Sequence, residues 1–125
     1  MNSENKIVYG GAVDNLLISI GNAYDKWNNP MASDDKHMVK IKKESAIRFK
    51  DGLKVKSGRK FDKIIENNSV WGFVAKKDGV LKGIPYLVGD VFKPASWSAP
   101  AKHVRGSIFD NSTEWFDWTG PNYLI

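Results

Sequence analysis

The apolar residues between Val13 and Trp27 recur at steps of three and four, and this spacing constrains the fold more than any other feature of the chain. The residues concerned are Val13, Leu16, Leu17, Ile20, Tyr24 and Trp27. Because an α-helix turns once in 3.6 residues, the spacing places them on one stripe. It predicts an amphipathic helix from about Ala12 to Trp27, with Tyr24 and Trp27 as anchors in the core.

From Met38 onward the apolar spacing changes to two. Apolar and basic residues alternate in three runs, 39–42, 47–50 and 53–56. Such alternation is typical of half-buried β-strands, and Asp51-Gly52 between two of the runs is a hairpin-turn signal. In this interpretation one solvent-facing side of a sheet carries Lys40, Lys42, Arg48, Lys50, Lys54 and Lys56.

Further strands are predicted over 61–66, 70–75, 86–88 and 91–92. The strand 70–75 is expected to be central because both its faces are apolar, with Trp71 and Phe73 on one and Val70 and Val74 on the other. A short helix is predicted near 99–105, and the aromatic tail from 115 onward is expected to fold back over the sheet. The predicted fold class is α+β: a single domain, 1–125, in which the N-terminal helix packs on a mostly antiparallel sheet of roughly four to six strands.

The charge of the chain is concentrated in one segment. The chain carries a net charge of +5, but the segment from Lys36 to Lys63 holds eleven cations and three anions, a net charge of +8. The rest of the chain is therefore net −3. Such asymmetry indicates a surface that faces a polyanion. The alternative is a sheet edge studded with lysine, which blocks pairing with other sheets.

Several classes of chemistry find no support in the sequence. Without cysteine the chain has no disulfides and no thiolate metal sites, and neither His37 nor His103 has metal-ligand spacing around it, so no metal and no cofactor are predicted. No apolar run is long enough to span a membrane, and no secretory leader is predicted. Asp90 and Asp110 are candidate acid–base carboxylates, although aspartate also favours turns and caps for local hydrogen-bonding reasons.

The stretch from Gly89 to Asp110 combines stiffness with positive charge. Pro94 and Pro100 fix its path around Trp97, and cations flank the indole at short range: Lys93, Lys102, His103 and Arg105. A cation cluster beside an indole can hold a phosphate while a base stacks. In the other interpretation, which we favour for Trp97 itself, the indole fills the core. Arg105 and Lys102 are expected to have a functional role.

A second candidate anion site is the segment Lys56-Ser57-Gly58-Arg59-Lys60. A glycine turn between cations can present backbone N–H groups to an anion. As a motif it is weak.

The segments 69–74 and 89–110, the latter with the run Lys-Pro-Ala-Ser-Trp, resemble a family of small uncharacterised proteins of tailed bacteriophages. The segments 58–64 and 120–124 and the helix ending at Trp27 are also similar to that family. Family members join two strands by a tight turn, whereas the connection from Lys76 to Leu87 is longer here. The resemblance implies a phage origin and the cytoplasm of a bacterial host. It brings no activity and no catalytic residue.

These observations lead to three hypotheses of function. The first is a non-enzymatic binder of polyanions, either single-stranded or structured nucleic acid, through Lys93, Trp97, Lys102, His103, Arg105, Lys56, Arg59, Lys60 and Arg48. The second is a counter-defence protein that sequesters a nucleotide signal or a host protein, with Arg105, His103 and Lys93 converging. The third is a small nuclease or nucleotide-processing enzyme, in which Asp90, Asp110 or His103 would meet in one cleft.

Overall fold

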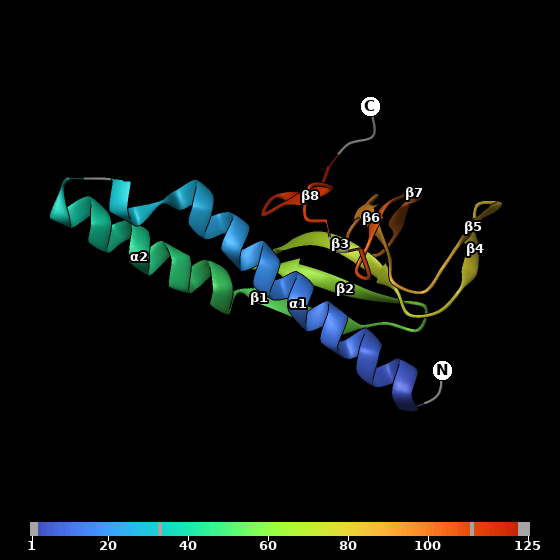
Figure 1. The fold of residues 1–125 in the computed structure, drawn as a ribbon. Helices are drawn as coiled ribbons and strands as arrows, with labels where there is room; N and C mark the ends of the chain where they lie inside the picture. Colours follow the sequence, from blue (N-terminus) through green and yellow to red (C-terminus); the bar gives the residue numbers. More distant parts are fainter. Residues whose placement is uncertain (1–2, 33, 111, 123–125) are drawn as a thin grey trace.

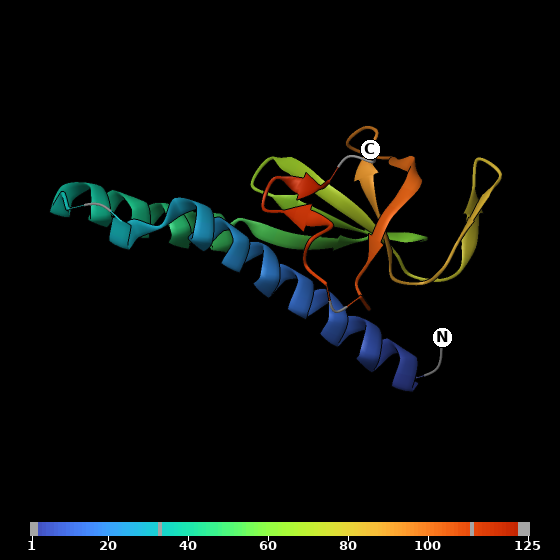
Figure 2. The ribbon, with the colours of Figure 1, turned by 45° about the horizontal axis from the view of Figure 1, so that its top comes forward.

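The computed structural model describes residues 3–32, 34–110 and 112–122, and side chains from Val8 onward. Helices α1 (Ser3–Asn28) and α2 (Lys36–Asp51) run antiparallel and are joined through the 3-10 turn η1 (Pro30–Ala32). Part of α1 lies against the sheet, and its C-terminal end projects beyond the sheet together with α2 (Figures 1 and 2). The predicted N-terminal helix is confirmed, and α1 is longer than the range 12–27 over which it was predicted. No helix in the described ranges is long and apolar enough to cross a membrane.

Helix α2 replaces two of the predicted strands. The prediction of strands over 39–42 and 47–50 is wrong, because Ala46 and Phe49 are buried at helical spacing. Asp35 caps the helix by accepting a hydrogen bond from the His37 amide (2.9 Å), which satisfies an orphan donor of the first turn. Asp51-Gly52 is the end of this helix and not a hairpin turn, since the Gly52 amide donates to the Arg48 carbonyl (3.0 Å).

The main sheet has five antiparallel strands in the order β1-β2-β3-β6-β7. Their bounds are β1 (Leu53–Ser57), β2 (Phe61–Glu66), β3 (Ser69–Ala75), β6 (Asp90–Pro94) and β7 (Pro100–Ser107). The predicted strands over 53–56, 61–66 and 70–75 are confirmed, and β3 is the central one. The predicted short helix near 99–105 is wrong. That segment is β7, because Val104 pairs with Phe92 and packs with it in the core.

Two small hairpins complete the fold. β4 (Gly79–Leu81) and β5 (Ile84–Tyr86) stand to one side of the sheet in Figures 1 and 2, and they account for the long connection between β3 and β6. β8 (Phe116–Asp117) and β9 (Gly120–Pro121) form the C-terminal hairpin, which contacts α1, β3 and β6. The expectation that the aromatic tail folds back over the sheet is therefore confirmed for 115–122, and the rest of that tail lies outside the described residues.

Each face of the sheet has its own apolar core. The first core, between the sheet and α1, contains Tyr9, Val13, Leu16, Ile20, Phe49, Ile64, Trp71, Val74, Val91 and Phe116. The second, on the other face, contains Phe73, Ala75, Tyr86 and Phe92. The prediction that Trp71 shares a face with Phe73 is wrong. A β-bulge shifts the register between Ile64 and Ile65, and the extra residue turns the indole of Trp71 toward α1.

Trp27 is not a core anchor. Its side chain is 65% exposed, because the end of α1 extends past the sheet and only α2 and the C-terminal hairpin remain to cover it. Tyr24 does pack on the core, with its ring stacked on Phe49 at 4.2 Å between centroids.

A buried polar contact fixes α1 on the sheet. The Tyr9 hydroxyl donates to Asp62 Oδ2 (2.8 Å), and both residues are buried. Burial, and secondly the hydrogen bond to Asp62, raise the pKa of Tyr9 far above its usual range. The neutral phenol is thus the folded form. In the unfolded chain the pKa of tyrosine is about 10. The stability that the neutral phenol contributes is present below that pH and is lost as the pH rises above it.

We expect Tyr9→Phe to lower the free energy of unfolding at neutral pH by about 1–3 kcal/mol, because it leaves a buried carboxylate oxygen without its donor. We also expect the variant to lose less stability than the wild type between neutral pH and a pH above about 10. Urea unfolding at the two pH values measures both effects. Tyr24→Phe is the matched control, since that ring packs by stacking. Identical pH dependence in wild type and Tyr9→Phe would contradict the expectation.

Candidate nucleic-acid interface

Strands β1 and β2 bring three lysines to one side of the sheet. Lys56 lies directly opposite Lys63 in the antiparallel register. Lys54 lies on the same side as Lys56, because side chains alternate along a strand. Like charges directly opposite one another destabilise a strand pair. The repulsion between these lysines therefore destabilises the pairing of β1 with β2, and an anion bound on this side of the sheet would relieve it.

Trp97 lies over this side of the sheet, in the connection between β6 and β7. The Nζ atom of Lys63 is 4.5 Å from the Trp97 ring centroid and 5.8 Å from that of Phe73. The indole is 49% exposed, so the prediction that Trp97 fills the core is wrong. Phe73 and Phe92 already fill the second core beneath it. The indole is thus left on the surface, next to a cation.

A hollow of about 230 Å³ opens beside this pair. We call it the basic hollow, and it is lined by Lys56, Ser57, Gly58, Arg59, Lys60, Phe61, Lys63, Phe73 and Ser98. Four of these residues are cations and none is an anion. Within the described ranges none of the four cations forms an ion pair. The candidates Lys56, Arg59 and Lys60 are thus brought together, and Ser98 joins them from the connection that carries Trp97.

The turn between β1 and β2 gives the basic hollow a fixed wall. The Gly58 amide donates to the Phe61 carbonyl (2.9 Å), and a β-carbon at Gly58 would lie 2.7 Å from that oxygen. Lys76 braces the turn from outside, since its ammonium donates to Ser57 Oγ (2.9 Å) and to the Gly58 carbonyl (3.0 Å). Arg59 and Lys60 are both exposed at the tip of this turn.

Lys93 and Arg105 lie on the opposite face of the sheet from Trp97. Lys93 alternates with Phe92 of the second core, and Arg105 donates to the Asn122 carbonyl (3.2 Å) beside the C-terminal hairpin. Burial, and secondly the charge of Arg105, lower the pKa of Lys93. Lys102 and His103 are exposed on β7. The candidates in 93–105 are thus divided between two faces and do not form one site.

The remaining candidate, Arg48, lies on α2 and donates to Ser45 Oγ (3.3 Å). The lysines that were expected on strands next to it are also helical. Four lysines on one flank of α2 follow helical spacing, at Lys36, Lys40, Lys43 and Lys50. Lys50 forms an ion pair with Asp25 of α1 (2.6 Å). Helix α2 is therefore a second cationic surface, separate from the basic hollow.

Each of the two candidate carboxylates accepts a hydrogen bond from a backbone amide two or three residues away, as its residue type favours. Asp90 accepts from the Leu87 amide (2.9 Å), and burial raises its pKa. Asp110 accepts from the Ser112 amide (2.9 Å). Among the described residues, no group of three or more histidine, aspartate or glutamate side chains is arranged to hold a metal ion.

A family model matches residues 14–124, a range that includes every residue of the basic hollow and both tryptophans on the surface. The chain belongs to this family, DUF7717, a family of unknown function. No curated protein and no solved structure matches the chain. Membership of DUF7717 brings no activity with it, so a function has to be argued from the site.

Two residues of the basic hollow, Lys63 and Phe73, were not singled out from the sequence as site residues. The signal for Lys63 was present, because a short turn around Gly58-Arg59-Lys60 sets Lys56 opposite Lys63. The contact of Lys63 with Trp97 had no such signal. It depends on how the 95–99 connection folds over the sheet, which the local sequence does not determine.

Proposed function

We infer that the protein is a non-enzymatic binder of single-stranded nucleic acid and that the basic hollow is its contact site. The observation that carries this proposal is the half-exposed indole of Trp97, 4.5 Å from the ammonium of Lys63, beside three further cations that have no ion pair in the described structure. Proteins that bind single strands combine a cationic groove for the backbone with aromatic rings on which bases stack. Both parts are present here, because Trp97 stands over Lys63 beside the basic hollow.

A single strand suits this site better than a duplex. A base can stack on Trp97 only if it is unstacked from a neighbouring base, as it can be in a single strand, and stacking contributes about 1–3 kcal/mol per base. Lys56, Arg59 and Lys60 lie on one short hairpin, so they fit a few adjacent phosphates of a flexible strand. As part of the same proposal, the resemblance to phage proteins supports an infected bacterial cytoplasm as the setting, where an accessory protein would meet single strands.

The proposal is tested by fluorescence anisotropy of a labelled oligothymidylate at several salt concentrations. We expect the logarithm of affinity to fall linearly with the logarithm of salt, with a slope of about −3 for four phosphate contacts on a single strand. Trp97→Ala should weaken binding by about 10-fold or more, the loss of one stacked base. Trp27→Ala removes an even more exposed indole elsewhere and should leave the affinity unchanged.

Other outcomes would favour the rival hypotheses. Affinity that does not increase with oligonucleotide length, with tight binding of a mononucleotide, would favour sequestration of a nucleotide signal. Cleavage of the oligonucleotide would favour a nuclease. No binding at low salt would contradict the proposal, and the lysines of β1 would then be explained as protection of a sheet edge.

A further inference from the structure

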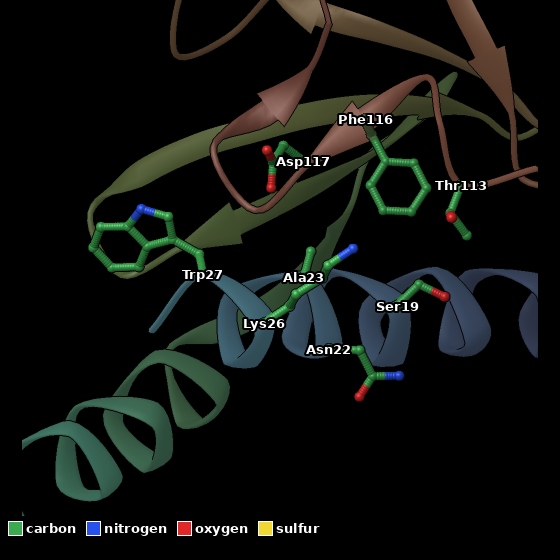
Figure 3. A pocket seen from close by; sticks show the side chains of 8 residues that line it. All are labelled: Ser19, Asn22, Ala23, Lys26, Trp27, Thr113, Phe116 and Asp117. Atoms are coloured by element: carbon green, nitrogen blue, oxygen red, sulfur yellow. The ribbon is translucent and has the colours of Figure 1, made fainter. Parts of the chain in front are cut away.

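A large hollow lies between α1 and the C-terminal segment, apart from the basic hollow. Its volume is about 660 Å³, within the range of about 300–1,000 Å³ that is usual for small-molecule sites. Figure 3 shows Ala23 and Lys26 of α1 opposite Asp117 of β8, with Trp27 at one end and Thr113 at the other. We call this hollow the helix groove. It shares no lining residue with the basic hollow.

The indole of Trp27 is exposed but held in place. Its ring centroid lies 4.8 Å from that of Trp118 and 5.8 Å from that of Tyr24. Tyr24 in turn stacks on the buried Phe49, so the cluster is anchored in the core. A rigid, exposed indole loses little conformational entropy when a ligand packs on it. It thus offers a preorganised flat apolar surface at the end of the helix groove.

The polar groups of the helix groove are balanced in charge. Asp117 Oδ1 accepts from the Trp118 amide (2.8 Å), which orients the carboxylate and leaves Oδ2 as an acceptor. Lys26 lines the same groove, and in the described chain it forms no ion pair with Asp117. The other polar lining groups are neutral, including the hydroxyls of Ser19 and Thr113. An anionic ligand therefore finds no net attraction here, unlike in the basic hollow.

We propose that the helix groove binds an uncharged saccharide. One face of a pyranose ring is made of C–H groups and can stack on the indole of Trp27. Its hydroxyls both donate and accept, which matches an acceptor on Asp117 and donors on Lys26 and Thr113. A few placed polar groups beside an aromatic surface are the usual way in which a small-molecule site fixes orientation. This site is independent of the proposed nucleic-acid function.

The test is an array of immobilised neutral oligosaccharides, built from hexoses and N-acetylhexosamines, probed with the full labelled chain. Dense display increases the retention of weak binders through avidity. We expect retention on a subset of glycans, lost about 10-fold or more in Trp27→Ala and in Asp117→Asn. The second variant keeps an acceptor for the Trp118 amide but replaces Oδ2, the carboxylate oxygen that this hydrogen bond does not use, with an amide donor. Trp97→Ala should retain the wild-type glycan pattern.

Three results would overturn the proposal: no glycan retained, retention that neither Trp27→Ala nor Asp117→Asn reduces, or displacement by adenosine or uridine but not by the matching free saccharide. Trp27→Phe covers the case in which Trp27→Ala fails to fold, and it should keep part of the retention. The nucleic-acid anisotropy of the same variants should equal that of the wild type. A failure of this site is therefore distinguishable from a failure of the basic hollow.

Discussion

Replacing Lys56, Arg59 and Lys60 together by glutamine is expected to weaken binding of a single-stranded DNA of about 12 nucleotides by about 100-fold at 0.1 M salt. Each phosphate contact on a single strand contributes about 0.7 to the salt slope, so the loss of three contacts should flatten the slope by about 2. The three side chains line the basic hollow and have no ion pair to lose in the described structure. Their replacement should therefore leave the fold intact, which circular dichroism checks.

Helix α2 provides the matched control for this experiment. Replacing Lys36, Lys40 and Lys43 by glutamine changes the net charge by the same amount, on exposed positions of a different element. We expect a loss of affinity well below 10-fold and a slope close to that of the wild type. Equal losses in the two triple variants would mean that the strand responds to the total charge of the protein. In that case the basic hollow would not be the site.

The two helices show where the spacing of apolar residues was sufficient to predict the secondary structure and where it was not. In α1 the apolar residues follow a helical spacing alone, and the structure confirms the helix. In 39–42 and 47–50, single basic residues separate single apolar residues, so these runs satisfy a period of two although the segment buries Ala46 and Phe49 at helical spacing. The N-cap at Asp35 and the end at Gly52 favoured the helix locally. What decides the conformation is that Phe49 reaches the stacked ring of Tyr24 on α1, a tertiary contact.

The candidate site was predictable where its parts are local in sequence. The cations of 56–60 form one turn, and that turn is one wall of the basic hollow. The second wall was not predictable, because Trp97 meets Lys63 across a distance of 34 positions in the chain. Lys93 and Arg105 were grouped with Trp97 because they are close in sequence. In a strand, however, successive side chains point to opposite faces of the sheet, so residues that are close in sequence can lie on different faces.

Trp71→Ala is expected to lower the free energy of unfolding by about 3–5 kcal/mol, a large part of the roughly 5–15 kcal/mol that is usual for a domain. The side chain is 1% exposed, and its ring meets Phe116 edge-on at 5.8 Å between centroids. Its Nε1 donates to the Asp117 carbonyl (3.0 Å), which ties the C-terminal hairpin to β3. The substitution therefore leaves a large cavity and also releases the hairpin that covers it.

Trp97→Ala is the matched control for Trp71→Ala, since the two substitutions remove an indole from opposite sides of the sheet. Urea unfolding should show a loss of less than about 1 kcal/mol for Trp97→Ala, because its ring is half exposed and lies against the ammonium of Lys63. Trp71→Phe should lie between the wild type and Trp71→Ala, since it keeps most of the packing but loses the donor to Asp117. If Trp97→Ala destabilised the protein as much as Trp71→Ala, Trp97 would have a structural role, and the argument for a stacking surface at the basic hollow would fail.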